Sequence, residues 1–190
     1  MTYFLIFISA VFVNNVVLAQ FLAICPFLGV SKKMETAVGM SGSVAFVMTI
    51  TIILTYTVQK TILDTFHVGF LQTIVFILIL ASLVQLVEIV LKKISPVLFQ
   101  ALGVFLPLMS TNCAIFGVAI LVIKKDYNLL ESIVFAVSSA IGFGLALIIF
   151  TGIREQLSLV KLPKGMEGIP IALIVAGLMA MAFMGFSGIV

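Results

Sequence analysis

Long apolar segments alternate with short charged clusters along the chain, and this alternation predicts membrane-spanning helices. Each segment is close to the roughly 20 residues that a helix needs to cross a bilayer. The predicted spans are residues 2–24, 37–59, 69–91, 97–123, 129–150 and 169–189. We therefore expect an all-α membrane protein with six transmembrane helices, forming a single integral membrane domain over residues 1–190.

The only two cysteines stand at matching points of a short repeat, because Cys25 opens "CPFLGV" and Cys113 opens "CAIFGV". The six spans divide into two groups of three, residues 1–95 and 96–190. Since three is an odd number, the second group enters the membrane from the opposite side. The matching motifs in the two halves therefore predict two inverted three-helix repeats. Their pseudo-twofold axis would bring the first and fourth spans together near the middle of the membrane.

The first and fourth spans are expected to be broken. The uncharged run over residues 1–31 is longer than one straight crossing requires. It holds Asn14, Asn15, Gln20 and Cys25-Pro26, and the fourth span holds Pro107 and Ser110-Thr111-Asn112 just before Cys113. Proline removes a helix hydrogen bond, and neighbouring polar side chains compensate the freed backbone groups. The alternative is a pair of proline-kinked but continuous helices.

Small residues spaced by four predict close helix packing in the last two spans. They are Ala136, Ala140 and Gly144 in the fifth span and Ala172, Ala176 and Ala180 in the sixth. These spans are interpreted as scaffold.

Charge and composition exclude several classes of protein. With 63% hydrophobic and 9% charged residues, the chain is too apolar for a soluble domain. Its basic residues are scattered through loops, so no nucleic-acid partner is expected. With the N-terminus outside, the inner loops hold seven of the ten basic residues, Lys32, Lys33, Lys92, Lys93, Arg154, Lys161 and Lys164. This bias predicts external termini, although the Lys124-Lys125-Asp126 cluster argues against it.

The two thiols allow four interpretations: inert packing, a disulfide, a redox dithiol or metal ligands. Their position beside helix interruptions adds to the case for metal binding, because helix N-termini and loose amides stabilise a thiolate, but on the residues alone inert packing stays ahead of it. An iron–sulfur cluster normally takes four thiolates, and this chain has two. A shared metal centre would therefore need two thiolates from another chain, and inert packing stays open.

Two charged positions allow more than one interpretation. Glu88 lies inside the third span, where ionisable groups often belong to ion pathways. It could equally form an i,i+4 pair with Lys92 near the cytosolic boundary. Arg154-Glu155 is a candidate docking point for a cytosolic partner, with an ordinary charged anchor as the alternative.

Several long motifs make the chain resemble the RnfA/NqrE family of membrane subunits. They are "VNNVVLAQFLAICPFLGVSKKMETAVGM", "LVQLVEIVLKKISPVLFQALGVFLPLMSTNCAIFGVA", "GIREQL" and "GLMAMAFMGFSG". The resemblance runs essentially end to end, and both cysteine motifs are specific to the family. One departure is Ala23, which stands where a glycine is expected.

The resemblance implies that Cys25 and Cys113 supply two ligands of a [2Fe–2S] cluster at mid-membrane, with an RnfE-like homologous subunit supplying the other pair. Asn112, Pro26 and Gly29 are then candidates for supporting the sulfur atoms. Complexes of this kind transfer electrons between ferredoxin and NAD and couple this to transport of Na+ or H+ across the bacterial inner membrane. RnfB-, RnfC-, RnfD- and RnfG-like subunits would carry the flavins and further iron–sulfur clusters.

Two other functions remain open at this point. Inverted repeats and broken helices also build the substrate sites of self-contained secondary transporters. Such a transporter would bring polar groups from several spans together. Here the polar residues within the spans concentrate at the expected helix interruptions beside Cys25 and Cys113. A purely structural subunit with inert thiols is the third possibility.

Overall fold

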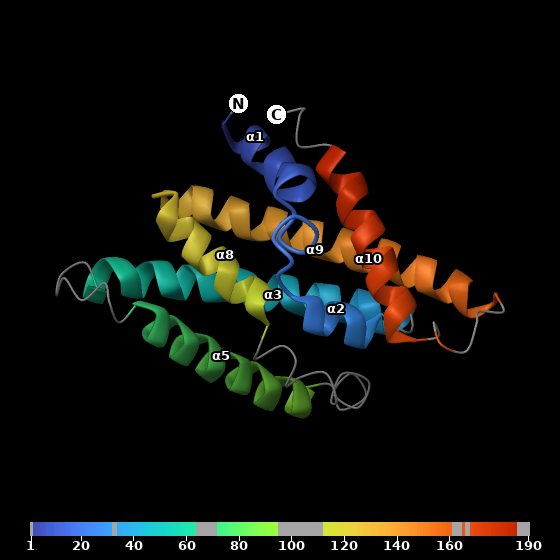
Figure 1. Ribbon diagram of the computed structural model, residues 1–190. Helices are drawn as coiled ribbons and strands as arrows, with labels where there is room; N and C mark the ends of the chain where they lie inside the picture. Colours follow the sequence, from blue (N-terminus) through green and yellow to red (C-terminus); the bar gives the residue numbers. More distant parts are fainter. Residues whose placement is uncertain are drawn as a thin grey trace.

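The computed structural model describes residues 2–31, 34–63, 72–94, 112–160, 165 and 168–185, and the regular structure in these ranges is helical (Figure 1). The elements are α1 (Thr2–Ile8), the π-helix η1 (Ser9–Val13), α2 (Ile24–Val30), α3 (Met34–Val58), the π-helix η2 (Gln59–Leu63), α5 (Gln72–Ile94), α8 (Cys113–Lys124), α9 (Leu129–Ser158) and α10 (Ile169–Met184). The expected all-α architecture is therefore confirmed for the described part of the chain.

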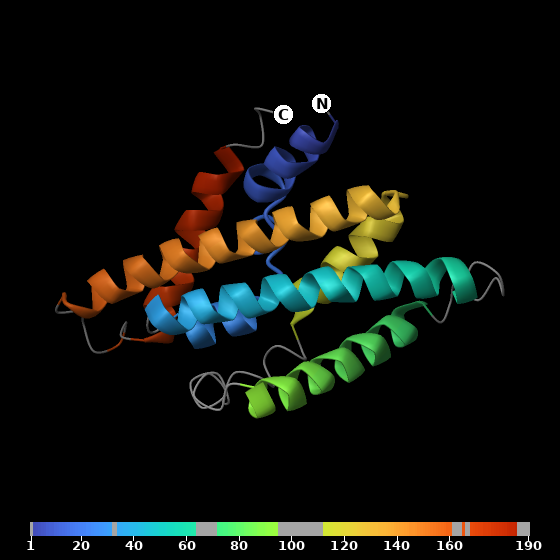
Figure 2. The same ribbon diagram turned by 180° about the vertical axis from the view of Figure 1, so that it is seen from behind.

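Two long antiparallel helices, α3 and α9, pack together at the centre of the molecule (Figure 1, Figure 2). Within the described ranges, they lie in the two helices long and apolar enough to cross a membrane. The small residues expected on the fifth span lie at this contact, since a Cβ atom on Gly144 would come within 3.1 Å of the Ser41 Cβ. Ala136 and Ala140 are buried beside it. The predicted close packing of the fifth span is thus confirmed.

The remaining predicted spans are tested only in part. The third and sixth correspond to the shorter apolar helices α5 and α10. Residues 97–111 of the fourth span lie outside the described residues, and α8 covers its end. The start of α1 and the end of α10 lie at the same end of the molecule, as termini on one membrane face require (Figure 1). The count of six spans, the inverted repeat and the orientation stay predictions.

The first span is interrupted between η1 and α2, over residues 14–23, here called the first break. Asn15 is fully buried in it. Its Nδ2 donates to the carbonyl oxygens of Val11 at 3.1 Å and Gly142 at 2.9 Å. Its Oδ1 accepts from the backbone N–H groups of Val17 at 3.0 Å and Leu18 at 3.4 Å. One side chain therefore satisfies backbone groups that the break frees and ties the break to α9.

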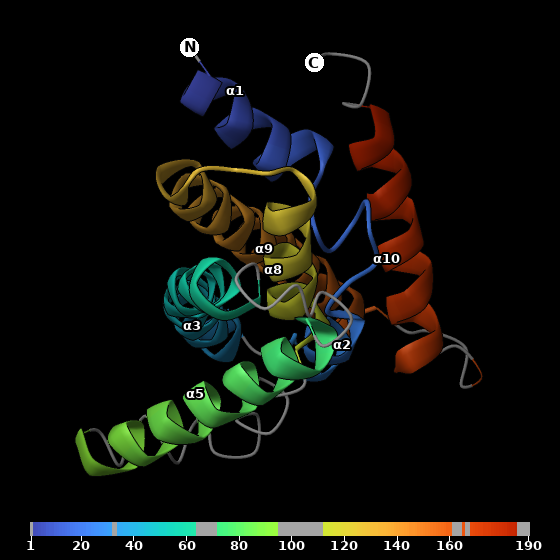
Figure 3. The ribbon, with the colours of Figure 1, turned by 90° about the vertical axis from the view of Figure 1, so that its left-hand side faces the viewer.

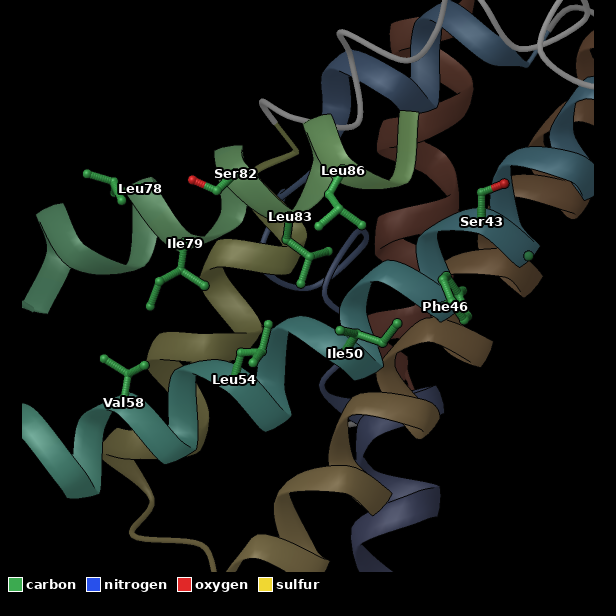
Figure 4. A pocket seen from close by; sticks show the side chains of 11 residues that line it. Ser43, Phe46, Ile50, Leu54, Val58, Leu78, Ile79, Ser82, Leu83 and Leu86 are labelled. Carbon is green, nitrogen blue, oxygen red and sulfur yellow. The ribbon is translucent and has the colours of Figure 1, made fainter. Parts of the chain in front are cut away.

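An apolar groove of about 800 Å³ opens between α3 and α5 (Figure 4). Leu83 and Leu86 of α5 and Ile50 of α3 line it, and Ser43 and Ser82 are the hydroxyl-bearing residues of the lining. A polar solute needs convergent polar groups in its site. The groove therefore offers few polar groups to a polar solute.

We predict that Asn15→Ala lowers the free energy of unfolding by about 2 kcal/mol or more, because it leaves buried backbone groups without partners. Thermal denaturation of the detergent-solubilised chain measures this. Asn14→Ala is the matched control, since the Asn14 Nδ2 donates only to the part-buried Ser9 Oγ at 3.2 Å among the described contacts. Equal losses in both variants would contradict the role assigned to Asn15.

Candidate metal centre

Cys25 is the second residue of α2 and is exposed on the chain surface. Pro26 and Phe27 follow it and are buried. The sequence predicts Pro26 as part of a helix interruption, and the structure places it in the first turn of α2. An amide N–H has no partner within the helix at this position, so proline is tolerated there. Pro26 thus helps α2 to begin next to the thiol.

The chain enters α2 through left-handed backbone. Phe21 has φ 54° and Ala23, the N-cap of α2, has φ 68°. A residue with a Cβ atom pays roughly 1–2 kcal/mol in this region, whereas glycine adopts it without that penalty. The glycine expected at position 23 from the family resemblance is therefore explained by the backbone. Ala23 is also 1% exposed, so a larger side chain has no room there.

Cys113 is the first residue of α8 and is likewise exposed. Asn112 is its N-cap, and the Asn112 side-chain oxygen accepts a hydrogen bond from the Ala114 N–H at 3.0 Å. The Asn112 Nδ2 is buried and has no hydrogen-bond partner among the described residues. A spare N–H donor therefore lies one residue from the thiol. The role of Asn112 in supporting the sulfur stays a prediction.

The N-terminal ends of α2 and α8 lie side by side near the middle of the α3–α9 pair (Figure 1, Figure 3). A Cβ atom placed on Gly117 of α8 would come within 2.5 Å of the Leu22 Cδ1, so the end of the first break packs directly on α8. Cys25 and Cys113 are not joined by a disulfide. Two exposed thiols thus stand at neighbouring helix starts.

The donor set fits half of an iron–sulfur cluster. No group of three or more His, Cys, Asp or Glu side chains gathers in the described part of the chain. Thiolate sulfur is the ligand that such clusters take, and the twelve-residue helix α8 favours negative charge at its first turn. The surroundings are apolar, with Phe27 and Ile115 buried. The residues that could hold such a group are therefore Cys25 and Cys113, together with ligands from elsewhere.

The other predicted site residues lie farther along their helices or outside the described part. Gly29 is in the last turn of α2 and is partly buried. Glu88 is half-buried in the second half of α5, and the side chain of Lys92 lies outside the described side chains. The ion-pathway and ion-pair interpretations of Glu88 therefore both stay predictions. Pro107, Ser110 and Thr111 lie outside the described residues.

Sequence reasoning missed the part that Arg154 plays. Its Nη1 donates to the Leu28 carbonyl oxygen at 2.9 Å and to the Ser31 Oγ at 2.7 Å. Arg154 thus contacts α2 from α9, while Glu155 beside it is exposed. The available signal was a lone arginine just beyond an apolar span, which is also typical of a surface anchor. Docking of a partner at this dipeptide stays a prediction.

Comparison with known proteins gives similarity over nearly the whole chain. Residues 3–190 match the family described as "Rnf-Nqr subunit, membrane protein". The A subunit of the Na(+)-translocating ferredoxin:NAD(+) oxidoreductase complex of Acetobacterium woodii is 60% identical over 188 residues, covering 99% of this chain and 98% of the relative. The A subunit of the ion-translocating oxidoreductase complex of Syntrophotalea carbinolica is 54% identical over 186 residues, with coverages of 98% and 96%.

Substitution of Ala23 tests the strained backbone that leads into α2. We expect Ala23→Gly to keep or raise thermal stability, by up to about 1 kcal/mol, because it removes the cost of the left-handed conformation. Ala23→Val should lower stability by more than this, since a β-branched residue at positive φ is an outlier. Thermal denaturation and membrane yield measure both. A valine variant as stable as the glycine variant would contradict this assignment.

Proposed function

Because the chain belongs to the Rnf-Nqr family of membrane subunits, we propose that it serves as the A subunit of an ion-translocating oxidoreductase complex. In this proposal the complex transfers electrons between ferredoxin and NAD and couples the transfer to movement of Na+ or H+. The chain itself holds half of an intramembrane [2Fe–2S] cluster. An RnfE-like subunit provides the other two thiolates, and both termini face the outside of the inner membrane.

The observation that carries the proposal is the pair of exposed thiols at the adjoining starts of α2 and α8 (Figure 3). Inert cysteines in a membrane protein are ordinarily buried as small apolar groups. Phe21 and Ile24 beside Cys25 are also exposed, at 56% and 39%. Exposed apolar surface on a membrane-spanning chain lies against lipid or against a partner subunit, so a partner subunit fits this face. This arrangement supports a centre completed by a second chain.

The residues of this chain have separate roles in the proposed centre. Cys25 and Cys113 bind as thiolates, and a cluster bound there supplies one-electron redox chemistry. The buried side chains of Phe27 and Ile115 exclude water from the inner side. The Asn112 Nδ2, on the residue before Cys113, is a buried donor without a partner among the described residues. Hydrogen bonds to sulfur and exclusion of solvent both tune cluster potentials, so these side chains would adjust the potential.

Three buried threonine hydroxyls weigh against a self-contained transporter. Thr51 and Thr55 of α3 donate to the carbonyls of Val47 and Thr51, four residues back, at 2.7 and 2.8 Å. Thr151 of α9 likewise donates to the Leu147 carbonyl at 2.7 Å. These hydroxyls are used within their own helices rather than arranged around a shared cavity. The pattern favours a scaffold around the thiols over a solute pathway.

Replacement of each thiol tests the cluster assignment. We expect Cys25→Ser and Cys113→Ser each to abolish the iron–sulfur EPR signal of this centre in the anaerobically purified complex, and with it electron transfer, while the chain stays folded in the membrane. Ser158→Ala, at the exposed end of α9, is the control and should keep the signal. Retention of the signal in either cysteine variant would refute the ligand assignment.

Glu88 is proposed as part of the ion pathway. An ionisable group within a span is costly in free energy, and such groups commonly belong to ion or proton pathways. We expect Glu88→Gln to weaken the apparent affinity for the transported cation about ten-fold, the scale of one lost charged contact. Ion uptake by proteoliposomes that contain the complex measures this. Glu35→Gln, at an exposed position in the first turn of α3, is the matched control. Unchanged transport rate and ion affinity in Glu88→Gln would remove Glu88 from the pathway.

A further inference from the structure

We propose that Arg154 is a positioning residue for the Cys25 ligand, and this inference rests on the proposed function. It fixes the short helix α2 on α9 and thereby sets where the Cys25 sulfur is presented. Arg154 does not touch the reacting atoms. It contacts the end of α2 opposite to the thiol, through Leu28 and Ser31.

The first supporting contact is with the backbone of α2. The last four carbonyl groups of a helix have no partner within it, and Leu28 is among the last residues of α2. The Arg154 Nη1 donates to this carbonyl at 2.9 Å and to the Ser31 Oγ at 2.7 Å. A cation at a helix C-terminus also complements the helix dipole. Arg154 therefore caps α2 by both hydrogen bonding and charge.

A second contact, one turn earlier on α9, acts on the neighbouring residue of α2. The rings of Phe150 and Phe27 stack with their centroids 4.2 Å apart and their planes 21° apart. The Arg154 guanidinium carbon lies 5.8 Å from the centroid of the Phe150 ring. Arg154 contacts Leu28 and Phe150 contacts Phe27, and these two residues are adjacent in α2. Together the two contacts fix how α2 is rotated about its axis and where it lies along α9.

The length of α2 makes these contacts necessary. It has seven residues, and helices of this length are not stable without tertiary contacts. It also follows the first break, so no preceding helix supports it. By contrast, α8 has twelve residues and its own N-cap in Asn112. Loss of Arg154 should therefore loosen the Cys25 side of the centre and leave the Cys113 side unchanged.

The test combines hydrogen exchange with redox titration of the intact complex. We expect amides of α2 to exchange about ten-fold faster in Arg154→Gln, the scale of one lost charged hydrogen bond, while amides of α8 exchange as before. The midpoint potential and EPR line shape of the cluster should change in the same variant. Arg154→Lys should partly restore both, because it keeps the charge and one donor. Lys60→Gln, at an exposed position of η2, is the control and should change neither.

Three results would overturn the proposal. They are unchanged exchange in α2, equal acceleration in α2 and α8, and faster exchange in α2 with an unaltered cluster potential. If Arg154→Gln does not assemble, Ser31→Ala removes one of the two contacts and should give a smaller change of the same kind. The exchange measurement does not depend on iron. Absence of a cluster from the wild-type complex would therefore refute the proposed function. The exchange measurement would still test whether Arg154 holds α2 on α9.

Discussion

Within a bilayer every backbone N–H and C=O group needs a partner inside the protein, and this requirement governs how the chain can be interrupted beside its cysteines. Two asparagines meet it in the same way. Asn15 accepts a hydrogen bond from the amide of Val17, and Asn112 accepts one from the amide of Ala114, in each case two residues further on. Asn15 also reaches the Gly142 carbonyl of α9. Polar side chains thus satisfy backbone groups within the first break and at the start of α8.

Much of this arrangement follows from the sequence because the signals are local. Apolar segments of nearly bilayer length predict α3 and α9, and small residues spaced by four predict close packing on α9, although they do not identify α3 as its partner. The polar residues before Cys25 predict the first break. The glycine expected at position 23 is explained once the backbone is known to be left-handed there, and Ala23 carries the cost of that conformation. Each of these predictions needs only the residues within one span and a general constraint from the membrane.

The remaining features depend on contacts between distant segments, which a single sequence does not reveal. Nothing local to Gly142 marks it as the glycine that faces Asn15, where a Cβ atom would come within 3.2 Å of Nδ2. Arg154 has the same sequence context as an ordinary interfacial anchor, yet its partners Leu28 and Ser31 are more than 120 residues away. Such tertiary contacts determine where α2 lies, and so they decide the geometry of the thiol it carries.

The two helices that begin at the thiols, α2 and α8, differ in length, so the two cysteines stand on unequal supports. At 1.5 Å per residue, α2 extends about 8 Å beyond Cys25 and α8 about 17 Å beyond Cys113. The Cys25 thiol therefore stands on a helix of less than two turns, whose place is decided by its contacts with α9, whereas the Cys113 thiol stands on a helix long enough to carry more of its own support.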